Sequence, residues 1–103
     1  MNFRLIMSLG FNVEDIQDIK IPPVKILLFI YGKEEVRYTD LTKLIASRGT
    51  LSANLKELEK EELIKRRAVT TKPIQTYYSL TEKGHKIAKA FNEVKERIAE
   101  FKK

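Results

Sequence analysis

Apolar residues recur at helical spacing in the first half of the chain, alternate with polar residues in the middle, and return to helical spacing at the end. The apolar run "VKILLFIYG" follows Pro22 and Pro23, which suit the first turn of a helix, and it ends at Gly32, a common stop signal. This run predicts a buried helix. A weaker pattern over residues 13–20 predicts a short helix before it.

The segment "EVRYTDLTKLIAS" predicts a second, shorter helix. Leu41, Leu44 and Ile45 fall at i, i+3 and i+4, so their side chains share one face. We expect a short extended piece at residues 36–38 before this helix and Thr39 as its capping residue.

A third helix is predicted after Ser47, which is a residue type that caps helix N-termini. Leu51, Leu55 and Leu58 form one apolar stripe, which leaves the other faces polar. Small hydrogen-bonding side chains near its start suit a close approach to DNA bases, although an ordinary amphipathic helix with a solvated face has the same pattern. The residues of this helix that we expect to contact DNA are Arg48, Thr50, Ser52, Asn54 and Lys56.

Residues 63–80 predict a β-hairpin that contains basic residues and no acidic ones. "LIKRRAV" and "IQTYYSL" are typical of strands, and "TTKP" between them is typical of a turn. Because no acid lies within the hairpin, its cations suit a phosphate backbone or a minor groove. The alternative is an edge hairpin whose charges merely prevent strand addition. The hairpin residues that we expect to contact DNA are Arg66, Arg67 and Lys72.

The last helix is predicted over residues 82–102, with Thr81 as its cap. Its apolar positions are separated alternately by four and three residues, which is the spacing of a heptad seam. A helix of this length extends ~30 Å, more than so small a domain covers, so we expect a homodimer. The alternative is that residues 2–21 cover the seam within one chain. The expected dimer residues are Phe91, Val94, Ile98 and Phe101.

Helix, turn, helix, basic hairpin and closing helix, in this order, form the plan of a winged helix-turn-helix domain. The predicted fold class is therefore α+β, mainly α, with a two-stranded hairpin as the wing. We expect an N-terminal arm with a short helix at residues 1–21, a DNA-binding domain at 22–81, and a C-terminal dimerisation helix at 82–103.

The sequence also resembles known families over residues 24 to about 91. "LSANLKELEKEELIKR" resembles the recognition helix and first wing strand of the MarR and HxlR families of prokaryotic transcriptional regulators. "KPIQTYYSLTEKG" is similar to the second wing strand and the leucine-threonine-x-x-glycine helix start of the HxlR family. Two features depart from these families. Glu62 stands where they usually have glycine, so we expect the helix end to form differently, and the chain lacks the cysteine that HxlR-type proteins tend to carry near their start.

Net charge favours a polyanionic partner. The chain carries 20 Lys and Arg against 14 Asp and Glu, a formal net charge of +6. Residues 1–36 sum to −1, residues 37–81 to +4 and residues 82–103 to +3. The positive charge therefore begins where the DNA-binding pattern begins.

Composition argues against several other classes. With no cysteine, the chain forms neither a disulfide nor a thiolate metal site, which favours an intracellular, cytoplasmic protein. The longest apolar run, "ILLFIY", is far below the ~20 residues of a membrane span. His85 is the only histidine and no phosphate-binding loop occurs, so we expect no enzyme, cofactor or metal. Abundant Lys, Glu and Ile suit a thermophile. From this and the resemblance to prokaryotic regulators, we expect an archaeal source.

These patterns predict a sequence-specific double-stranded DNA-binding transcriptional regulator that acts as a homodimer on a palindromic site, with no small-molecule effector. Its third helix would enter the major groove, and its wing would contact the backbone or the minor groove. The alternatives are a sequence-neutral DNA-coating protein and a winged helix used for contacts between proteins.

Overall fold

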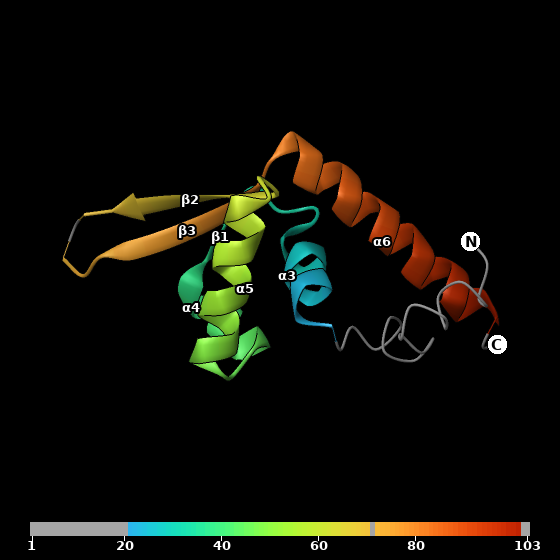
Figure 1. Cartoon of the computed structure of the whole chain (residues 1–103), viewed down its shortest axis with the longest axis horizontal. Helices are drawn as coiled ribbons and strands as arrows, with labels where there is room; N and C mark the ends of the chain where they lie inside the picture. The colour runs from blue at the N-terminus through green and yellow to red at the C-terminus, as the bar shows by residue number, and fades with distance from the viewer. Residues whose placement is uncertain (1–20, 71, 102–103) are drawn as a thin grey trace.

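The computed structural model describes residues 21–70 and 72–101. The helix predicted at residues 13–20 lies outside them. Three helices lie at the centre, a hairpin projects to one side and a long helix leaves on the other, which gives a molecule of 49 × 27 × 26 Å (Figure 1). The described elements are α3 (Pro22–Ile30), β1 (Val36–Arg37), α4 (Tyr38–Leu44), α5 (Arg48–Lys60), β2 (Ile64–Val69), β3 (Gln75–Leu80) and α6 (Glu82–Phe101).

The first described helix, α3, begins and ends as its sequence predicts. Pro22 is its first residue. Proline has no N–H, and at this position an N–H would have no acceptor within the helix, so no hydrogen bond is lost. The helix ends in a tight turn in which the Lys33 N–H donates to the Ile30 carbonyl over 2.9 Å. Gly32 has a φ of +83° in this turn, a conformation that glycine adopts without steric cost.

The start of α4 differs from the prediction. The helix begins at Tyr38 with Arg37 as its N-cap, so Thr39 lies inside the first turn and is not the capping residue. Asp40 determines this start, because its carboxylate accepts a hydrogen bond from the Arg37 N–H over 3.1 Å. The extended piece is therefore shorter than predicted, and Tyr38 is already helical.

The predicted hairpin is confirmed as β2 and β3, and β1 adds a third strand. Both pairs are antiparallel, in the order β1-β3-β2, so β3 is the central strand. Tyr78 on β3 lies opposite Val36 of β1 and Arg66 of β2. The two-residue strand β1, which lies between α3 and α4, thus pairs with the wing through β3.

The C-terminal end of α5 contains a left-handed residue that is not glycine. Glu62 has a φ of 60°. The Leu63 N–H donates to the Leu58 carbonyl and the Glu62 N–H to the Glu59 carbonyl, each over 2.9 Å, which is the Schellman pattern. The expectation of a different helix end was therefore wrong, because Glu62 adopts the left-handed conformation that glycine commonly adopts at the end of a helix.

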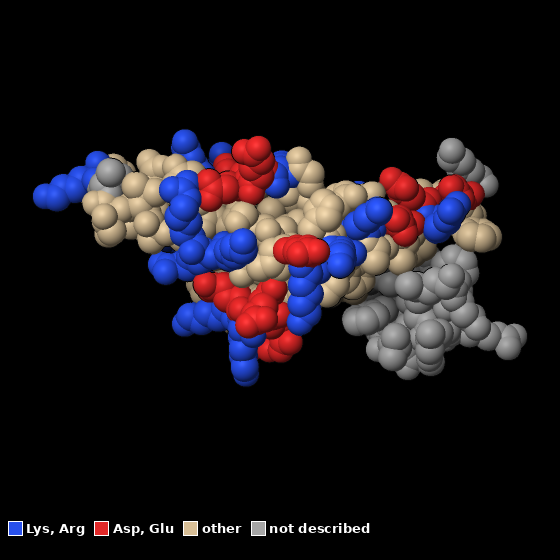
Figure 2. Space-filling model, turned by 90° about the horizontal axis from the view of Figure 1, so that it is seen from above, with Lys and Arg blue, Asp and Glu red and all other residues tan. Residues whose placement is uncertain are grey.

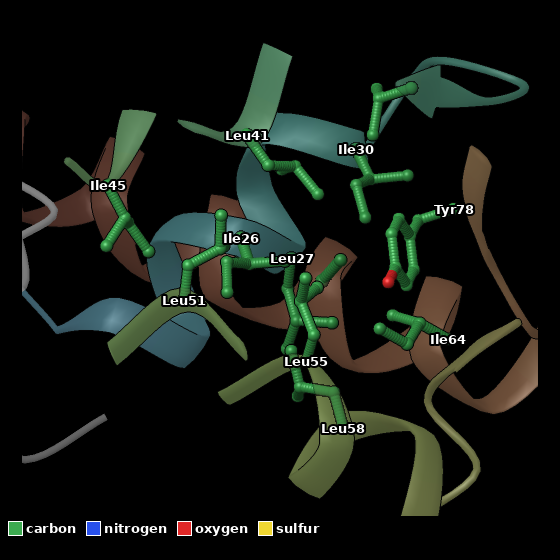
Figure 3. Packing of buried hydrophobic residues seen from close by; sticks show 12 residues of the cluster. Ile26, Leu27, Ile30, Leu41, Ile45, Leu51, Leu55, Leu58, Ile64 and Tyr78 are labelled. Carbon is green, nitrogen blue, oxygen red and sulfur yellow. The ribbon is translucent and has the colours of Figure 1, made fainter. Parts of the chain in front are cut away.

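The core lies between the helices and the inner face of the sheet (Figure 3). The leucine stripe of α5 packs against α3, as its spacing predicts. This burial holds one face of α5 inward and leaves its opposite face on the surface. The buried cluster consists of Ile26, Leu27, Ile30, Val36, Leu41, Ile45, Leu51, Leu55, Leu58, Ile64, Tyr78 and Ala88.

The long helix α6 starts on the core and then leaves it. The predicted cap is confirmed, since the Gly84 N–H donates to the Thr81 hydroxyl over 2.9 Å. The Thr81 hydroxyl in turn donates to the Glu62 carbonyl over 2.6 Å, which ties α6 to the end of α5. Fully buried Ala88 packs in the core, whereas the last turns of α6 extend away from α3 (Figure 1).

Candidate nucleic-acid interface

The exposed side of α5 begins at a firmly capped N-terminus. The Ser47 hydroxyl accepts a hydrogen bond from the Thr50 N–H over 3.3 Å, so the predicted cap is confirmed. Arg48 and Lys56 are exposed, while Ser52 is partly covered. The helix therefore offers cations and a small hydroxyl on the side that its leucine stripe leaves free.

A hollow of about 270 Å³ separates α5 from the inner face of the wing. Arg66 reaches this face because it alternates with buried Ile64 along β2 and lies opposite Tyr78. The structure thus brings three of the predicted DNA-contacting residues together around one hollow. Its lining consists of Tyr38, Ser52, Leu55, Lys56, Glu59, Arg66 and Tyr78.

Tyr78, a buried residue of β3, is among the titratable residues that line this hollow. Burial raises the pKa of Tyr78, and the neighbouring Arg66 partly opposes that rise. Tyr78 therefore stays neutral in neutral solution and supplies a hydroxyl there without adding charge. The positive charge of the hollow comes from Lys56 and Arg66, with Glu59 opposing it.

Two other predicted residues lie on the opposite flank of α5. Thr50 and Asn54 are about 160° away from Ser52 around the helix, so neither of them lines the hollow beside the wing. The Asn54 amide donates to the Thr50 carbonyl over 2.8 Å. An amide has two N–H groups, so Asn54 keeps one donor and its oxygen for another partner.

Arg67 is held on the outer face of the wing by a residue outside the hairpin. Its Nε donates to Glu35 Oε2 over 2.9 Å and its Nη2 to Glu35 Oε1 over 2.7 Å. The guanidinium carbon also lies 4.5 Å from the ring centroid of Tyr77, and that of Arg37 lies 6.0 Å away. These hydrogen bonds lower the pKa of the Glu35 carboxyl and raise the pKa of Arg67. Arg66 and Arg67 therefore have different surroundings.

Sequence reasoning missed this ion pair because it considered only acids within the hairpin. Glu35 immediately precedes β1, and only the pairing of β1 with β3 brings it beside the wing. No local sequence pattern predicts that pairing, because β1 has only two residues and is too short to show the alternation of a strand.

The tip of the wing carries Lys72, which is exposed. Figure 2 shows a basic side chain at the far end of the hairpin, whereas Asp and Glu lie over the body and along the long helix. Ile74 beside it is 71% exposed. Ile74 is not among the residues that the sequence pattern predicted to contact DNA.

The four residues predicted for the dimer interface differ in exposure. Phe91 and Val94 are partly covered, and Ile98 is only 1% exposed. Phe101, at the end of α6, is 73% exposed. The apolar seam of α6 therefore continues beyond the part of this helix that packs in the core.

Residues 21–70 and 72–101 contain neither a metal-binding cluster nor a helix that could span a membrane. In these segments, no group of three or more His, Cys, Asp or Glu side chains is placed to hold a metal ion. None of the helices described there combines the length and the apolar character that crossing a bilayer requires. His85 is exposed, and its ring lies 5.3 Å from that of Tyr31.

The chain resembles known transcriptional regulators in sequence and in fold. YodB of Bacillus subtilis strain 168, an HTH-type transcriptional regulator, is 33% identical over 67 residues, which cover 63% of this chain and 60% of YodB. A structure described as a MarR-family transcriptional regulator from Porphyromonas gingivalis W83 is 26% identical with a TM-score of 0.64, covering 81% of this chain and 83% of that one. The regulator ytfH of Salmonella typhimurium shares the fold, with a TM-score of 0.70 at 22% identity over 82% of this chain and 77% of its own.

These relatives are transcriptional regulators and not enzymes. The family model for HxlR-like helix-turn-helix proteins matches residues 24–103, which include α5, the wing and the whole described length of α6. The chain therefore belongs to the HxlR-like helix-turn-helix family of transcriptional regulators.

Proposed function

We propose that this chain is a sequence-specific double-stranded DNA-binding regulator that acts as a homodimer. One observation carries the proposal: the polar flank of α5 and the acid-free wing face each other across one hollow. A duplex presents bases in its major groove and phosphates beside it, which match a small hydroxyl next to cations. Ser52, Lys56 and Arg66 surround this hollow.

Helix α5 is the element that enters the major groove in this proposal. Ser52 and Asn54 read base edges, because hydroxyl and amide groups have both donors and acceptors. Arg48 and Lys56 contact phosphates, and Thr50 supports Asn54 through its carbonyl. The buried leucine stripe lies on the inner side of α5 and leaves the two flanks that carry Ser52 and Asn54 outside the core cluster.

The wing adds contacts that depend on charge more than on sequence. Arg66 faces the hollow, and Lys72 is exposed at the tip, so both are available to phosphates or to a minor groove. Arg67 donates from its Nε and Nη2 to Glu35. We therefore give Arg67 mainly a positioning role, in which it fixes the outer face of the wing against the body.

The dimer forms through α6 in this proposal, with Phe91, Val94 and Phe101 along the seam, whereas Ile98 is already buried within the single chain. Their alternating spacing suits helix pairing, and α6 reaches past the core. Two copies on a twofold axis would read two half-sites about 34 to 36 Å apart, which gives a palindromic site. Residues 22–81 would form the reading unit, and the protein would work in the cytoplasm.

Regulation by thiol oxidation is not part of this proposal. HypR is described as a redox regulator, and YodB has been solved after treatment with diamide. The 103 residues of this chain include no cysteine, so they offer no thiol for such a response. We propose that DNA binding depends on the amount of protein or on a partner, without a small-molecule effector.

Selection of binding sites from random duplex DNA tests the proposal. The dissociation constants for the selected site and for random duplex are then compared at one stated salt concentration. We expect a ratio of at least about 10³, which is typical of specific regulators. A ratio near one would indicate a DNA-coating protein, and absence of DNA binding would indicate a winged helix used for contacts between proteins.

A further inference from the structure

The tip of the wing exposes a large aliphatic side chain. Ile74 is 71% exposed, and among the described residues only Phe101 is a large hydrophobic residue of comparable exposure. Ile74 also lines a hollow of about 310 Å³ together with Arg37 and Thr39. Its apolar surface therefore stays in water in the isolated chain.

A single exposed aliphatic residue is common on proteins and does not by itself indicate a site. The surroundings of Ile74 distinguish it from such a residue. It follows exposed Lys72 and Pro73 at the end of a hairpin that contains no acid, so the tip combines an apolar group with positive charge. A surface of this kind complements an apolar base stack between two rows of phosphates.

The length of the wing places this tip at a suitable distance from α5. Each of β2 and β3 has six residues, which corresponds to about 20 Å of strand. Strand β2 begins just after α5 ends, and the hairpin then projects from the body (Figure 1). With α5 in a major groove, the next minor groove lies about half a helical turn away, or roughly 17 Å. The tip therefore reaches that groove.

We propose that Ile74 is an apolar wedge that enters the minor groove, partly unstacks one base step and bends the DNA. This inference rests on the proposed function above. Isoleucine and proline are among the residues that architectural proteins use in this way, and the resulting kinks are directed toward the major groove. The β-branched side chain of Ile74 has few rotamers, so little freedom is lost on insertion.

The proposal also specifies a sequence preference outside the bases that α5 reads. Pyrimidine–purine steps such as TA and CA/TG unstack most easily. We expect one such step under each wing tip of the bound dimer. Affinity would then depend on the deformability of a step that no side chain reads by hydrogen bonding.

The test uses the duplex recovered by site selection, with 2-aminopurine placed in turn at each step flanking the half-sites. Its fluorescence rises when a base loses stacking. We expect a rise at one flanking step when the wild-type chain binds, and loss of that rise with Ile74→Ala. Energy transfer between dyes at the two duplex ends should report a bend that disappears with it. Since Ile74 is exposed, this replacement leaves the core intact.

Two further variants separate the wedge from a general weakening of binding. Ile74→Met keeps a long apolar side chain and should restore both signals. Lys72→Ala should lower the affinity and the salt dependence, with the bend and the fluorescence retained once the site is saturated.

The outcomes distinguish the wedge from the proposed function. Wild-type binding without a rise in fluorescence, or a rise in fluorescence that survives Ile74→Ala at saturation, would overturn the wedge alone. A change in sedimentation mass with Ile74→Ala and an unaltered rise would instead place Ile74 in a contact between chains. Failure of the wild-type chain to bind duplex DNA would overturn the proposed function as well.

Discussion

Gly84 of α6 lies directly against the backbone of Leu63, the last residue of the link between α5 and the wing. A Cβ atom at position 84 would stand 1.8 Å from the Leu63 carbonyl oxygen, far inside van der Waals contact. The same carbonyl accepts a hydrogen bond from the Thr81 N–H over 3.1 Å. The start of α6 and the base of the wing therefore form one tightly packed junction, which explains the glycine of the leucine-threonine-x-x-glycine motif.

Replacing Gly84 with alanine should destabilise the domain. Alanine favours a helix by ~1 kcal/mol over glycine, but overpacking against an immobile backbone typically costs ~1 to 3 kcal/mol, and this overlap is severe. We expect a net loss of about 2 kcal/mol or more in the free energy of unfolding, measured with urea. Gly49→Ala on α5 is the control, because nothing lies within 4 Å of its added Cβ. That variant should be neutral or more stable, and equal losses in both variants would contradict the role of the junction.

Glu62→Gly should stabilise the chain. A side chain in the left-handed region costs roughly 1 to 2 kcal/mol, while glycine adds roughly 0.5 to 1 kcal/mol of entropy to the unfolded state. The difference predicts a gain of about 0.5 to 1 kcal/mol in the free energy of unfolding. Glu61→Gly is the matched control, because Glu61 has a φ of −78° and gains nothing from glycine. Thermal unfolding that ranks the two variants in the opposite order would contradict this account.

Arg66 and Arg67 should differ in their effect on DNA binding although they are neighbours. Arg66→Ala should weaken binding and flatten the slope of log K against log salt by about 0.9, the value for one lost phosphate contact. Arg67→Ala should change this slope less, because its guanidinium is already bound to Glu35. Glu35→Gln removes the carboxylate that holds Arg67, together with one negative charge, so it should leave the slope unchanged or make it steeper. Equal flattening by both arginine variants would mean that Glu35 does not keep Arg67 from the DNA.

Asn54→Ala should relax base preference at one position of each half-site. The expected loss is ~1 to 3 kcal/mol for the preferred base, with little change for the other three. Repeating the site selection with the variant measures this directly. Lys56→Ala provides the contrast, since loss of a phosphate contact should weaken binding to all sequences alike. A selected site that keeps its preference at every position would remove Asn54 from the set of reading residues.

The helices and the hairpin were predictable because their signals are local. The leucine stripe of α5, the caps at Ser47 and Thr81, and the turn glycine at position 32 all act within a few residues, and each is found in the structure as expected. Thr39 is the exception among the caps. The carboxylate of Asp40 accepts a hydrogen bond from the Arg37 N–H, so α4 begins before Thr39.

What the sequence did not reveal depends on segments that are distant along the chain. Glu35 and Arg67 are 32 residues apart, and only the closure of the sheet by β1 brings them together. Helix geometry places Ser52 and Asn54 on different flanks of α5. Which of the two faces the wing depends on how α5 is rotated in the core. Glu62 shows the limit of residue preference, because the packing around Thr81 and Leu63 holds it in a conformation that its own side chain disfavours.

The homodimer is best tested at Phe101. Ile98 is buried in the single chain, so a charge there would disturb the protomer itself, whereas Phe101 is 73% exposed at the end of α6. Wild-type protein at micromolar concentration should sediment with a mass near twice 12.0 kDa. Phe101→Asp should shift this toward the monomer and weaken binding to a palindromic site, because both half-sites would no longer be held by one particle. Lys89→Asp adds the same acid on the opposite face of α6, where Lys89 is exposed, and should leave the mass unchanged. A wild-type monomer that binds the palindrome tightly would show that α6 does not join two chains.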